Sequence, residues 1–295
     1  MSFVEVLNFG SLNIDHVYRV PHFVAPGETL GCQDYSVFAG GKGLNQSIAL
    51  ARAGIKTAHA GKIGADGTFL VQTLQNSGVD TTFVFTGETP TGHASIQVDQ
   101  SGQNSILLYP GANCMISENE IVAVLEKQSP GTWLLLQNEI NSIPFLIREA
   151  KKRGMKIAIN PAPCTDAVKD YPLELVDILF VNEIEASQLS GCQGSFEEIA
   201  DALAKQYPQA QIVMTLGSIG AIYRCGAYSH FEPARKVKVV DTTSAGDTFC
   251  GYFLSSLLKG MTPEKAMFYA AKASSVTVSR AGAAQSIPSA EEIFS

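Results

Sequence analysis

The sequence predicts an α/β fold in which helices cover both faces of a mostly parallel β-sheet, with a smaller, separate β-sheet attached. Three observations support this prediction. Along most of the chain, strand, glycine-rich turn and helix alternate. Four strand-like segments lie outside that alternation, as two pairs without a helix inside either pair. Finally, 295 residues, 45% of them hydrophobic, are enough to bury the core of one large domain.

Two pairs of strand-like segments form the expected small sheet. A turn divides each pair: Pro26-Gly27 in the first and Asp99-Gln-Ser-Gly102 in the second, which is typical of a hairpin. The expected strands are residues 14–20, 29–38, 92–98 and 104–108. We therefore assign residues 11–39 and 91–109 to the small sheet, and residues 1–10, 40–90 and 110–295 to the α/β core.

The expected core elements are separated by glycines or by helix-capping residues. Ser117-Glu-Asn-Glu120 and residues 195–198 are capping boxes, in which a serine and a glutamate satisfy the first N–H groups of a helix. The expected strands are residues 4–9, 57–62, 133–137, 156–160, 178–181, 211–215 and 236–240. The expected helices are residues 43–53, 68–77, 117–127, 144–153, 183–190, 196–206, 250–258 and 263–279, with a short one after Ser289. Ligands of such sheets bind beyond the carboxyl ends of the strands.

The composition argues against several classes of function. The net charge is −7 and no lysine- or arginine-rich run occurs, so neither nucleic acid nor an anionic membrane is an expected partner. No apolar run approaches the ~20 residues of a membrane span, and the N-terminus does not resemble a signal peptide. Six scattered cysteines without a C-x-x-C pair indicate reduced thiols and a cytoplasmic location. Five scattered histidines without H-E-x-x-H do not favour a zinc site.

One stretch, Asp241-Thr-Thr-Ser-Ala-Gly-Asp-Thr-Phe249, has the residues expected of a catalytic turn between a strand and a helix. The free N–H groups and the positive dipole end of a helix start form an anion site, which Gly246 lets a ligand approach closely. Asp247 beside that site would repel a bound phosphate. A carboxylate there suits proton abstraction from a hydroxyl that attacks a phosphoryl group. A simple helix cap is the alternative role for Asp247.

These residues resemble the signature of the ribokinase-like (phosphofructokinase-B) sugar kinases, and the resemblance extends from about residue 8 to residue 288. It implies a three-layer α/β/α fold whose small sheet is a lid, and ATP-dependent phosphorylation of a sugar. Asp247 would be the catalytic base, and the backbone of Ser244, Ala245 and Gly246 would form the anion hole. The match is most complete with the ribose-phosphorylating members, although Leu44 and Thr243-Ser244 differ from the usual residues.

Three further segments carry polar residues that the resemblance assigns to the sugar. Gly40-Gly-Lys-Gly-Leu-Asn45 is not a Walker A loop, because Gly43 stands where that motif has Ser or Thr. Each segment also has a purely structural alternative. Residues 40–45 would then form a tight turn, residues 13–15 would form an Asx turn, and Glu139 would be a charge at a helix start. The resemblance implies that the sugar is bound by Asn13, Asp15, Gly41, Lys42, Asn45, Glu139 and Asp247.

The resemblance also implies a nucleotide site and two cation sites. Asn182 and Glu185 would lie at the phosphate end, with Glu185 binding Mg²⁺ through water. ATP would also contact Thr215, Gly217, Gly220 and Gly246. A monovalent cation (K⁺) beside the anion hole would be held by oxygens of Asp241, Thr243, Thr277, Arg280, Gly282 and Ser286. Without the resemblance, the acidic pair would merely complement a helix dipole, and residues 280–286 would be an ordinary loop.

The expected function is therefore that of an ATP-dependent sugar kinase acting on D-ribose, as a homodimer formed through the lid. Another pentose, a ketohexose or a nucleoside is an alternative acceptor. A non-catalytic sugar or nucleotide sensor is an alternative of a different class, but a sensor need not keep Asp247, Gly246 and the segment 182–185. A dinucleotide-dependent oxidoreductase would need G-x-G-x-x-G after the first strand, which residues 10–15 lack.

Overall fold

The structure, a computed structural model, describes residues 4–295 and contains two β-sheets. The larger sheet has nine strands: β13 (Tyr228–Pro233), β12 (Gly220–Cys225), β11 (Gln211–Thr215), β10 (Ile178–Asn182), β9 (Lys156–Asn160), β8 (Trp133–Gln137), β1 (Val6–Phe9), β4 (Thr57–Ile63) and β5 (Asp80–Thr86), in that spatial order. Neighbouring strands from β11 to β5 are parallel, and β12 and β13 add an antiparallel edge. The predicted mostly parallel sheet is confirmed.

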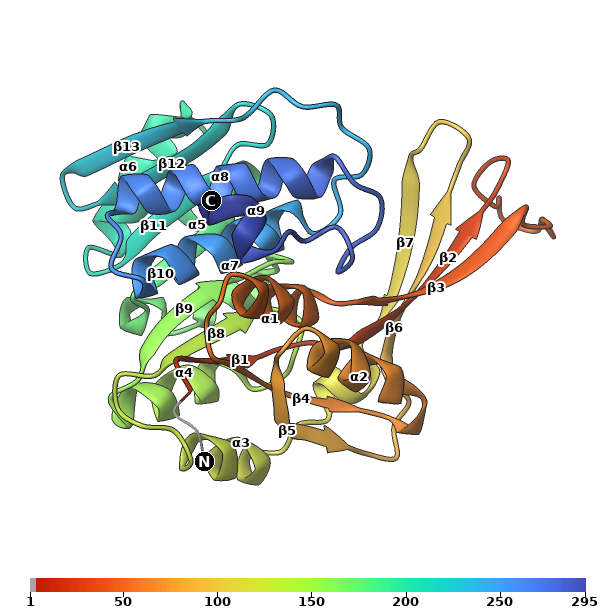
Figure 1. Cartoon of the computed structure of the whole chain (residues 1–295), viewed down its shortest axis with the longest axis horizontal. Helices are drawn as coiled ribbons and strands as arrows, with labels where there is room; N and C mark the ends of the chain where they lie inside the picture. The colour runs from red at the N-terminus through yellow and green to blue at the C-terminus, as the bar shows by residue number, and fades with distance from the viewer. Residues whose placement is uncertain (1–3) are drawn as a thin grey trace.

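Helices cover both faces of this sheet (Figure 1). Successive strand residues face opposite sides, so Val6 belongs to one hydrophobic cluster and Leu7 to the other. The first cluster includes residues of α1 (Lys42–Arg52), α2 (Thr68–Asn76), α7 (Ala245–Leu258), α8 (Pro263–Val278) and α9 (Ala290–Phe294). The second includes residues of α3 (Glu118–Leu125), α4 (Ile143–Lys152), α5 (Glu183–Ser190) and α6 (Phe196–Gln206). This is the predicted three-layer architecture. Within residues 4–295, no helix is both long and apolar enough to cross a membrane.

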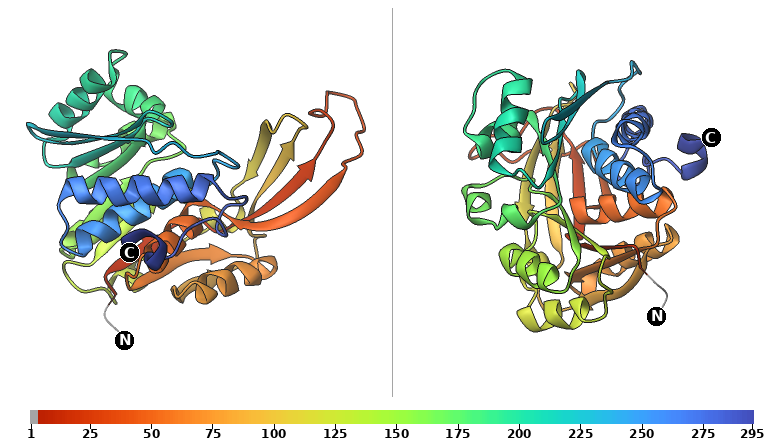
Figure 2. Two further views of the ribbon diagram at one scale, coloured as in Figure 1. Left: turned by 45° about the horizontal axis from the view of Figure 1, so that its top comes forward. Right: turned by 90° about the vertical axis from the view of Figure 1, so that its left-hand side faces the viewer.

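A second sheet of four strands projects from one end of this core (Figures 1 and 2). Its spatial order is β3 (Asp34–Gly40), β2 (Asn13–Arg19), β6 (Gly92–Val98) and β7 (Asn104–Tyr109). β2 and β6 are parallel, whereas β3 and β7 run antiparallel to their neighbours. The sheet is thus assembled from the two predicted pairs of strand-like segments. Every residue of β7 is exposed. The division of the chain into a core and a lid stays a prediction.

The predicted strand at residues 236–240 is wrong. This segment follows β13, the edge strand of the large sheet, in the chain, and it pairs with no strand within residues 4–295. Its end is attached to α8 instead, because Val240 N–H donates to the carbonyl of Val278 at 2.8 Å. Val239 and Val240 are 58% and 55% exposed, so their β-branched side chains do not contribute to a sheet core. The local preference for strand is not enough without a neighbouring strand.

Other differences concern boundaries and short elements. The strand expected at residues 29–38 begins only at Asp34, because the turn after Pro26-Gly27 continues as exposed irregular chain. Helix α7 begins at Ala245, so Asp247 lies in the first helical turn rather than before it. The edge strands β5 and β13, and β12 next to β13, were not predicted. Short 3₁₀ helices, also not predicted, are η1 (Ala65–Gly67), η2 (Gly111–Cys114), η3 (Asp166–Asp170) and η4 (Leu173–Leu175).

Candidate active site

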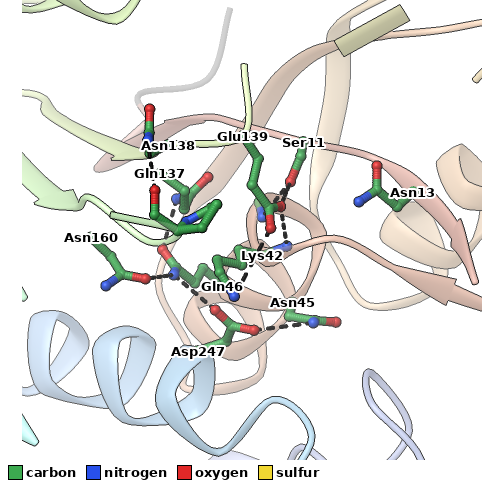
Figure 3. Close-up of polar contacts among 12 residues, drawn as sticks. Ser11, Asn13, Lys42, Asn45, Gln46, Gln137, Asn138, Glu139, Asn160 and Asp247 are labelled. Carbon is green, nitrogen blue, oxygen red and sulfur yellow. Dashed lines mark hydrogen bonds and ion pairs between the residues drawn. The ribbon is translucent and has the colours of Figure 1, made fainter. Parts of the chain in front are cut away.

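Asp247 points from α7 toward α1, where two side-chain amides hold its carboxylate (Figure 3). Nδ2 of Asn45 donates to Oδ2 at 3.1 Å, and Nε2 of Gln46 donates to Oδ1 at 2.9 Å. In a helix cap, the carboxylate would instead accept from the first N–H groups of α7. Here both oxygens accept from side chains of α1. Burial raises the pKa of the Asp247 carboxyl, while Lys42 and the two amides oppose the shift. A carboxylate with a raised pKa and a fixed orientation is suited to accept a proton.

A second carboxylate, Glu139, lies at the start of α1 (Figure 3). It accepts hydrogen bonds from the Ser11 hydroxyl and, at 3.0 Å, from the backbone N–H of Lys42. The Lys42 ammonium group lies 3.9 Å from the other Glu139 oxygen. Burial alone would lower the pKa of Lys42, but the nearby carboxylates Asp247, Glu139 and Glu185 raise it above the ordinary value. Lys42 therefore stays protonated among these three carboxylates.

Asn13 and Asp15 lie on β2, the strand that connects the core to the small sheet. Asn13 Oδ1 accepts a hydrogen bond of 2.7 Å from Nδ2 of Asn113. The Asn113 side chain also bonds the backbone of Leu12, because its Nδ2 donates to the Leu12 carbonyl and its Oδ1 accepts from the Leu12 N–H. Asp15 is paired across the strands with Phe38, and a Cβ atom added to Gly40 would come within 2.0 Å of its Oδ2. Gly40 therefore leaves room for the Asp15 carboxylate. Burial, reinforced by Glu139 and opposed by Lys42, raises the pKa of Asp15 to about 7.

The backbone at the start of α7 leaves N–H groups available to an anion. Ala245 N–H already donates to Thr242 O at 3.3 Å, whereas those of Gly246 and Asp247 bond to no acceptor within residues 4–295. Ser244, the N-cap residue, has the left-handed backbone conformation (φ 62°). Its buried hydroxyl is without a hydrogen-bond partner among the same residues. Strain and an unpaired polar atom at one helix start are typical of a ligand-binding turn.

Asn182 and Glu185 form a reciprocal capping box at the start of α5. Glu185 N–H donates to Asn182 Oδ1 at 2.8 Å, and Asn182 N–H donates to Glu185 Oε2 at 3.0 Å. Glu185 is 8% exposed, and burial raises the pKa of its carboxyl. Thr215, Gly217 and Gly220 lie at the turn between β11 and β12, next to β10 in the sheet. Both segments thus follow the carboxyl ends of adjacent strands.

Asp241 ties together the two loops that the resemblance assigns to a monovalent cation. Its Oδ1 accepts from the N–H and hydroxyl of Thr243 at 2.9 and 2.6 Å, and its Oδ2 accepts from Gly282 N–H at 3.1 Å. The other predicted side chains point elsewhere: Thr277 donates to Thr248, Ser286 to the carbonyl of Ala283, and Arg280 to Glu292. Any contact of Arg280 with a cation would therefore have to come from its backbone carbonyl.

The structure brings together residues of the site that the sequence analysis did not single out. Gln46, Gln137 and Asn113 are all buried and hydrogen-bonded to predicted residues or to each other. Two of them had a visible signal, since Gln46 directly follows Asn45 and Gln137 ends an apolar strand with an amide. Asn113 lies about a hundred residues from Asn13, and no local pattern connects them. Leu44, which departs from the usual residue, is completely buried in the core.

Comparisons with known proteins identify relatives along the whole chain. Residues 5–290 match the pfkB family of carbohydrate kinases. The ribokinase of Haemophilus influenzae is 37% identical over 291 residues, which cover 96% of this chain and 95% of the relative. The ribokinase of Staphylococcus aureus is 36% identical over 300 residues, which cover 98% of this chain and 98% of the relative. The structure is similar to that of Arabidopsis thaliana ribokinase complexed with ribose and ATP, with a TM-score of 0.89, 29% identity, and coverage of 99% of this chain and 98% of that one.

Proposed function

The chain belongs to the pfkB family of carbohydrate kinases, and on this premise we propose that it transfers the γ-phosphoryl group of ATP to the 5-hydroxyl of D-ribose. One observation carries the proposal: a buried carboxylate, Asp247, is oriented by two amides beside a helix start with free N–H groups. Relatives that are ribokinases at 36–37% identity favour ribose among the sugars.

The acceptor hydroxyl is activated by Asp247 in the proposed mechanism. Its raised pKa makes it a stronger base than an exposed aspartate, and its position at a helix start aims it at the transferred phosphoryl group. Asn13, Asp15 and Lys42 bind the remaining hydroxyls and so hold the 5-hydroxyl in place. Ionised Asp15 accepts hydrogen bonds from a diol, whereas Lys42 can only donate and Asn13 donates through its Nδ2 group.

The start of α7 supplies the electrostatic stabilisation. The N–H groups of Gly246 and Asp247 are free and the helix dipole is positive there, so charge that develops on the phosphoryl group is stabilised. The segment 182–185 and the β11–β12 turn with Thr215, Gly217 and Gly220 bind the nucleotide. The small sheet acts as a lid that excludes water and limits hydrolysis of ATP.

Two cations complete the proposed site. Within residues 4–295, no three His, Cys, Asp or Glu side chains cluster as a metal site, so Mg²⁺ would depend mainly on ATP and water. Glu185 fits this role, because only its Oε2 serves the helix cap. Asp241, Thr243 and Gly282 fit a K⁺ site, because Asp241 holds two oxygen-rich loops together. Mg²⁺ would neutralise phosphate charge, and K⁺ would reinforce the positive potential of the anion hole.

The proposed assembly is a homodimer through the lid, in the cytoplasm. Ile106 and Leu108 of β7 share the sheet face that carries Asp15, and they are 56% and 44% exposed. A second lid would cover this face. All six cysteines are free thiols, as the cytoplasm would keep them. Sedimentation analysis tests the assembly: the double variant Ile106→Glu/Leu108→Glu should be monomeric, and a wild-type monomer at all concentrations would contradict it.

The activity is tested by measuring ADP release with ATP and Mg²⁺ across a sugar panel led by D-ribose, with and without K⁺. D-ribose should give the highest kcat/KM, and Asp247→Asn should abolish the turnover. Turnover with another sugar or a nucleoside alone would keep the mechanism and change the substrate. Binding of a sugar without turnover under any condition would overturn the proposal in favour of a sensor.

A further inference from the structure

Asp247 stands at the end of a buried chain of side-chain amides that runs through the core. Gln46 donates to Asp247 Oδ1 at 2.9 Å and accepts from Nε2 of Gln137 at 2.7 Å. Gln137 also donates to Oδ1 of Asn8 at 3.0 Å, as Figure 3 shows in part. All three amide residues, Asn8, Gln46 and Gln137, are completely buried. Their strands and helix, β1, α1 and β8, belong to the core and not to the small sheet.

The direction of this chain is set by a backbone carbonyl. Nδ2 of Asn8 donates at 2.7 Å to the carbonyl of Gly43, which can only accept. Asn8 must therefore present its own oxygen to Gln137, which in turn must present an N–H to the oxygen of Gln46. Gln46 is then left with its NH₂ group facing Asp247. Each amide in the series has only one orientation that satisfies its neighbours.

A second backbone carbonyl requires the same orientation of Gln46. Nδ2 of Asn160 donates to Phe180 O at 3.0 Å, so its Oδ1 faces Gln46 Nε2, at 3.4 Å. Glycines make this packing possible: a Cβ on Gly43 would lie 2.3 Å from Ser11 N, and one on Gly10 would lie 2.2 Å from Gln137 Oε1. Two independent acceptors thus keep the Gln46 oxygen away from the Asp247 carboxylate.

We infer that Gln46 is a positioning residue for Asp247 and that Gln137 acts through it, so that the chain of amides keeps Asp247 ionised and correctly oriented. The inference rests on the proposed role of Asp247 as base. A reversed Gln46 would aim its carbonyl at the carboxylate, and the repulsion would favour the protonated, inactive acid. The charged groups that act on Asp247 are Lys42 and Glu139, and burial followed by Asp247 raises the pKa of the Cys250 thiol.

The test compares kcat, the KM for D-ribose, the pH dependence of kcat and the Tm of Gln46→Leu, Gln137→Leu, their double variant and Asp247→Asn. Gln72→Leu, at an exposed amide of α2, is the control. Loss of a hydrogen bond to a charged group predicts a kcat about tenfold to a hundredfold lower for Gln46→Leu, with KM within about twofold. The acidic limb of its pH profile should move to higher pH, because the lost amide donor no longer lowers the pKa of Asp247. Gln137→Leu should show the same shift with a smaller loss, about threefold to tenfold.

The double variant distinguishes an effect that Gln137 exerts through Gln46 from a general loss of structure. If Gln137 acts through Gln46, the double variant loses no more kcat than Gln46→Leu alone, whereas independent effects would multiply. Should Gln46→Leu not fold, Gln137→Leu carries the same test, because it does not touch Asp247. An unchanged acidic limb in both variants, or multiplicative losses, would overturn the inference while an inactive Asp247→Asn preserved the proposed function. An active Asp247→Asn would instead overturn the proposed function.

Discussion

The two aspartates of the proposed sugar site are held in opposite ways. Asp247 belongs to a core helix, and both of its oxygens accept hydrogen bonds from amides of α1. Asp15 belongs to β2 of the small sheet, and its carboxylate is hydrogen-bonded to none of the residues 4–295 that the structure describes. Burial is nevertheless the largest cause of a raised pKa in both carboxyl groups.

This difference is the one expected between a preorganised base and a ligand-binding group, the roles proposed for Asp247 and Asp15. Asp247 is oriented before the sugar arrives, so no reorganisation is needed at the moment of proton transfer. Asp15 lacks donors, and sugar hydroxyls would supply them. We therefore expect that changes at Asp247 mainly lower the catalytic rate, whereas changes at Asp15 mainly weaken sugar binding. Substitutions at the two sites and at their supporting residues test that separation.

Replacing the base should nearly abolish turnover. Asp247→Asn keeps the volume and removes the proton acceptor, so kcat should fall by about a thousandfold, within the usual range for general base catalysis. The KM for D-ribose should change by less than about threefold, because binding depends on other groups. Steady-state kinetics measure both constants. Glu197→Gln, an exposed acid in the first turn of α6, is the matched control. Retention of a tenth of the wild-type kcat would contradict the assignment.

Replacing the lid aspartate should act on binding instead. Asp15→Asn loses a charge-assisted hydrogen bond to the sugar, so the KM for D-ribose should rise by about tenfold to a hundredfold. The kcat at saturating sugar should fall much less than in Asp247→Asn. Asp34→Asn, an exposed position of the same small sheet, should leave both constants unchanged. A loss confined to kcat would show that the two aspartates are not separated in this way.

The pH dependence should distinguish the two carboxylates further. The pKa of Asp15 is raised to about 7, so the carboxyl is ionised above that pH and protonated below it. Below pH 7 the ionised fraction falls about tenfold per pH unit, and kcat/KM for the sugar should fall with it. In Asp15→Asn this limb near pH 7 should disappear. An unchanged limb in the variant would assign the titration to another group.

The smallest effect is expected where a core residue supports the lid. Asn113, on η2, holds Asn13 Oδ1 and the backbone of Leu12. Asn113→Ala should raise the KM for D-ribose by about twofold to tenfold with little effect on kcat, because neutral hydrogen bonds contribute modestly. Asn104→Ala, on the exposed strand β7, is the control. A fall in kcat as large as that in Gln46→Leu would mean that the lid and the base are coupled.

The sequence predicted the core better than its edges. Buried parallel strands such as β8 are short apolar runs bounded by turns, and their period and composition identify them directly. The segment 236–240 has the same local appearance, but it pairs with no strand within residues 4–295 and remains irregular chain on the surface. Edge strands such as β5 and β13 are partly exposed, which weakens the hydrophobic pattern on which such a prediction depends.

For the site, the amino-acid sequence is enough to predict the chemistry of the individual groups, whereas the contacts between them depend on the tertiary structure. The stretch 241–249 and the segment 40–45 each carry the residues of a predicted role (base, anion site, sugar donors) within a few positions, so local order suffices to predict them. The amide chain from Asn8 through Gln137 and Gln46 to Asp247 joins residues up to about two hundred positions apart. Only the parallel order of β1 and β8 beside α1 brings them into contact. Hydrogen bonds depend on distance and direction in space, which a linear pattern does not contain.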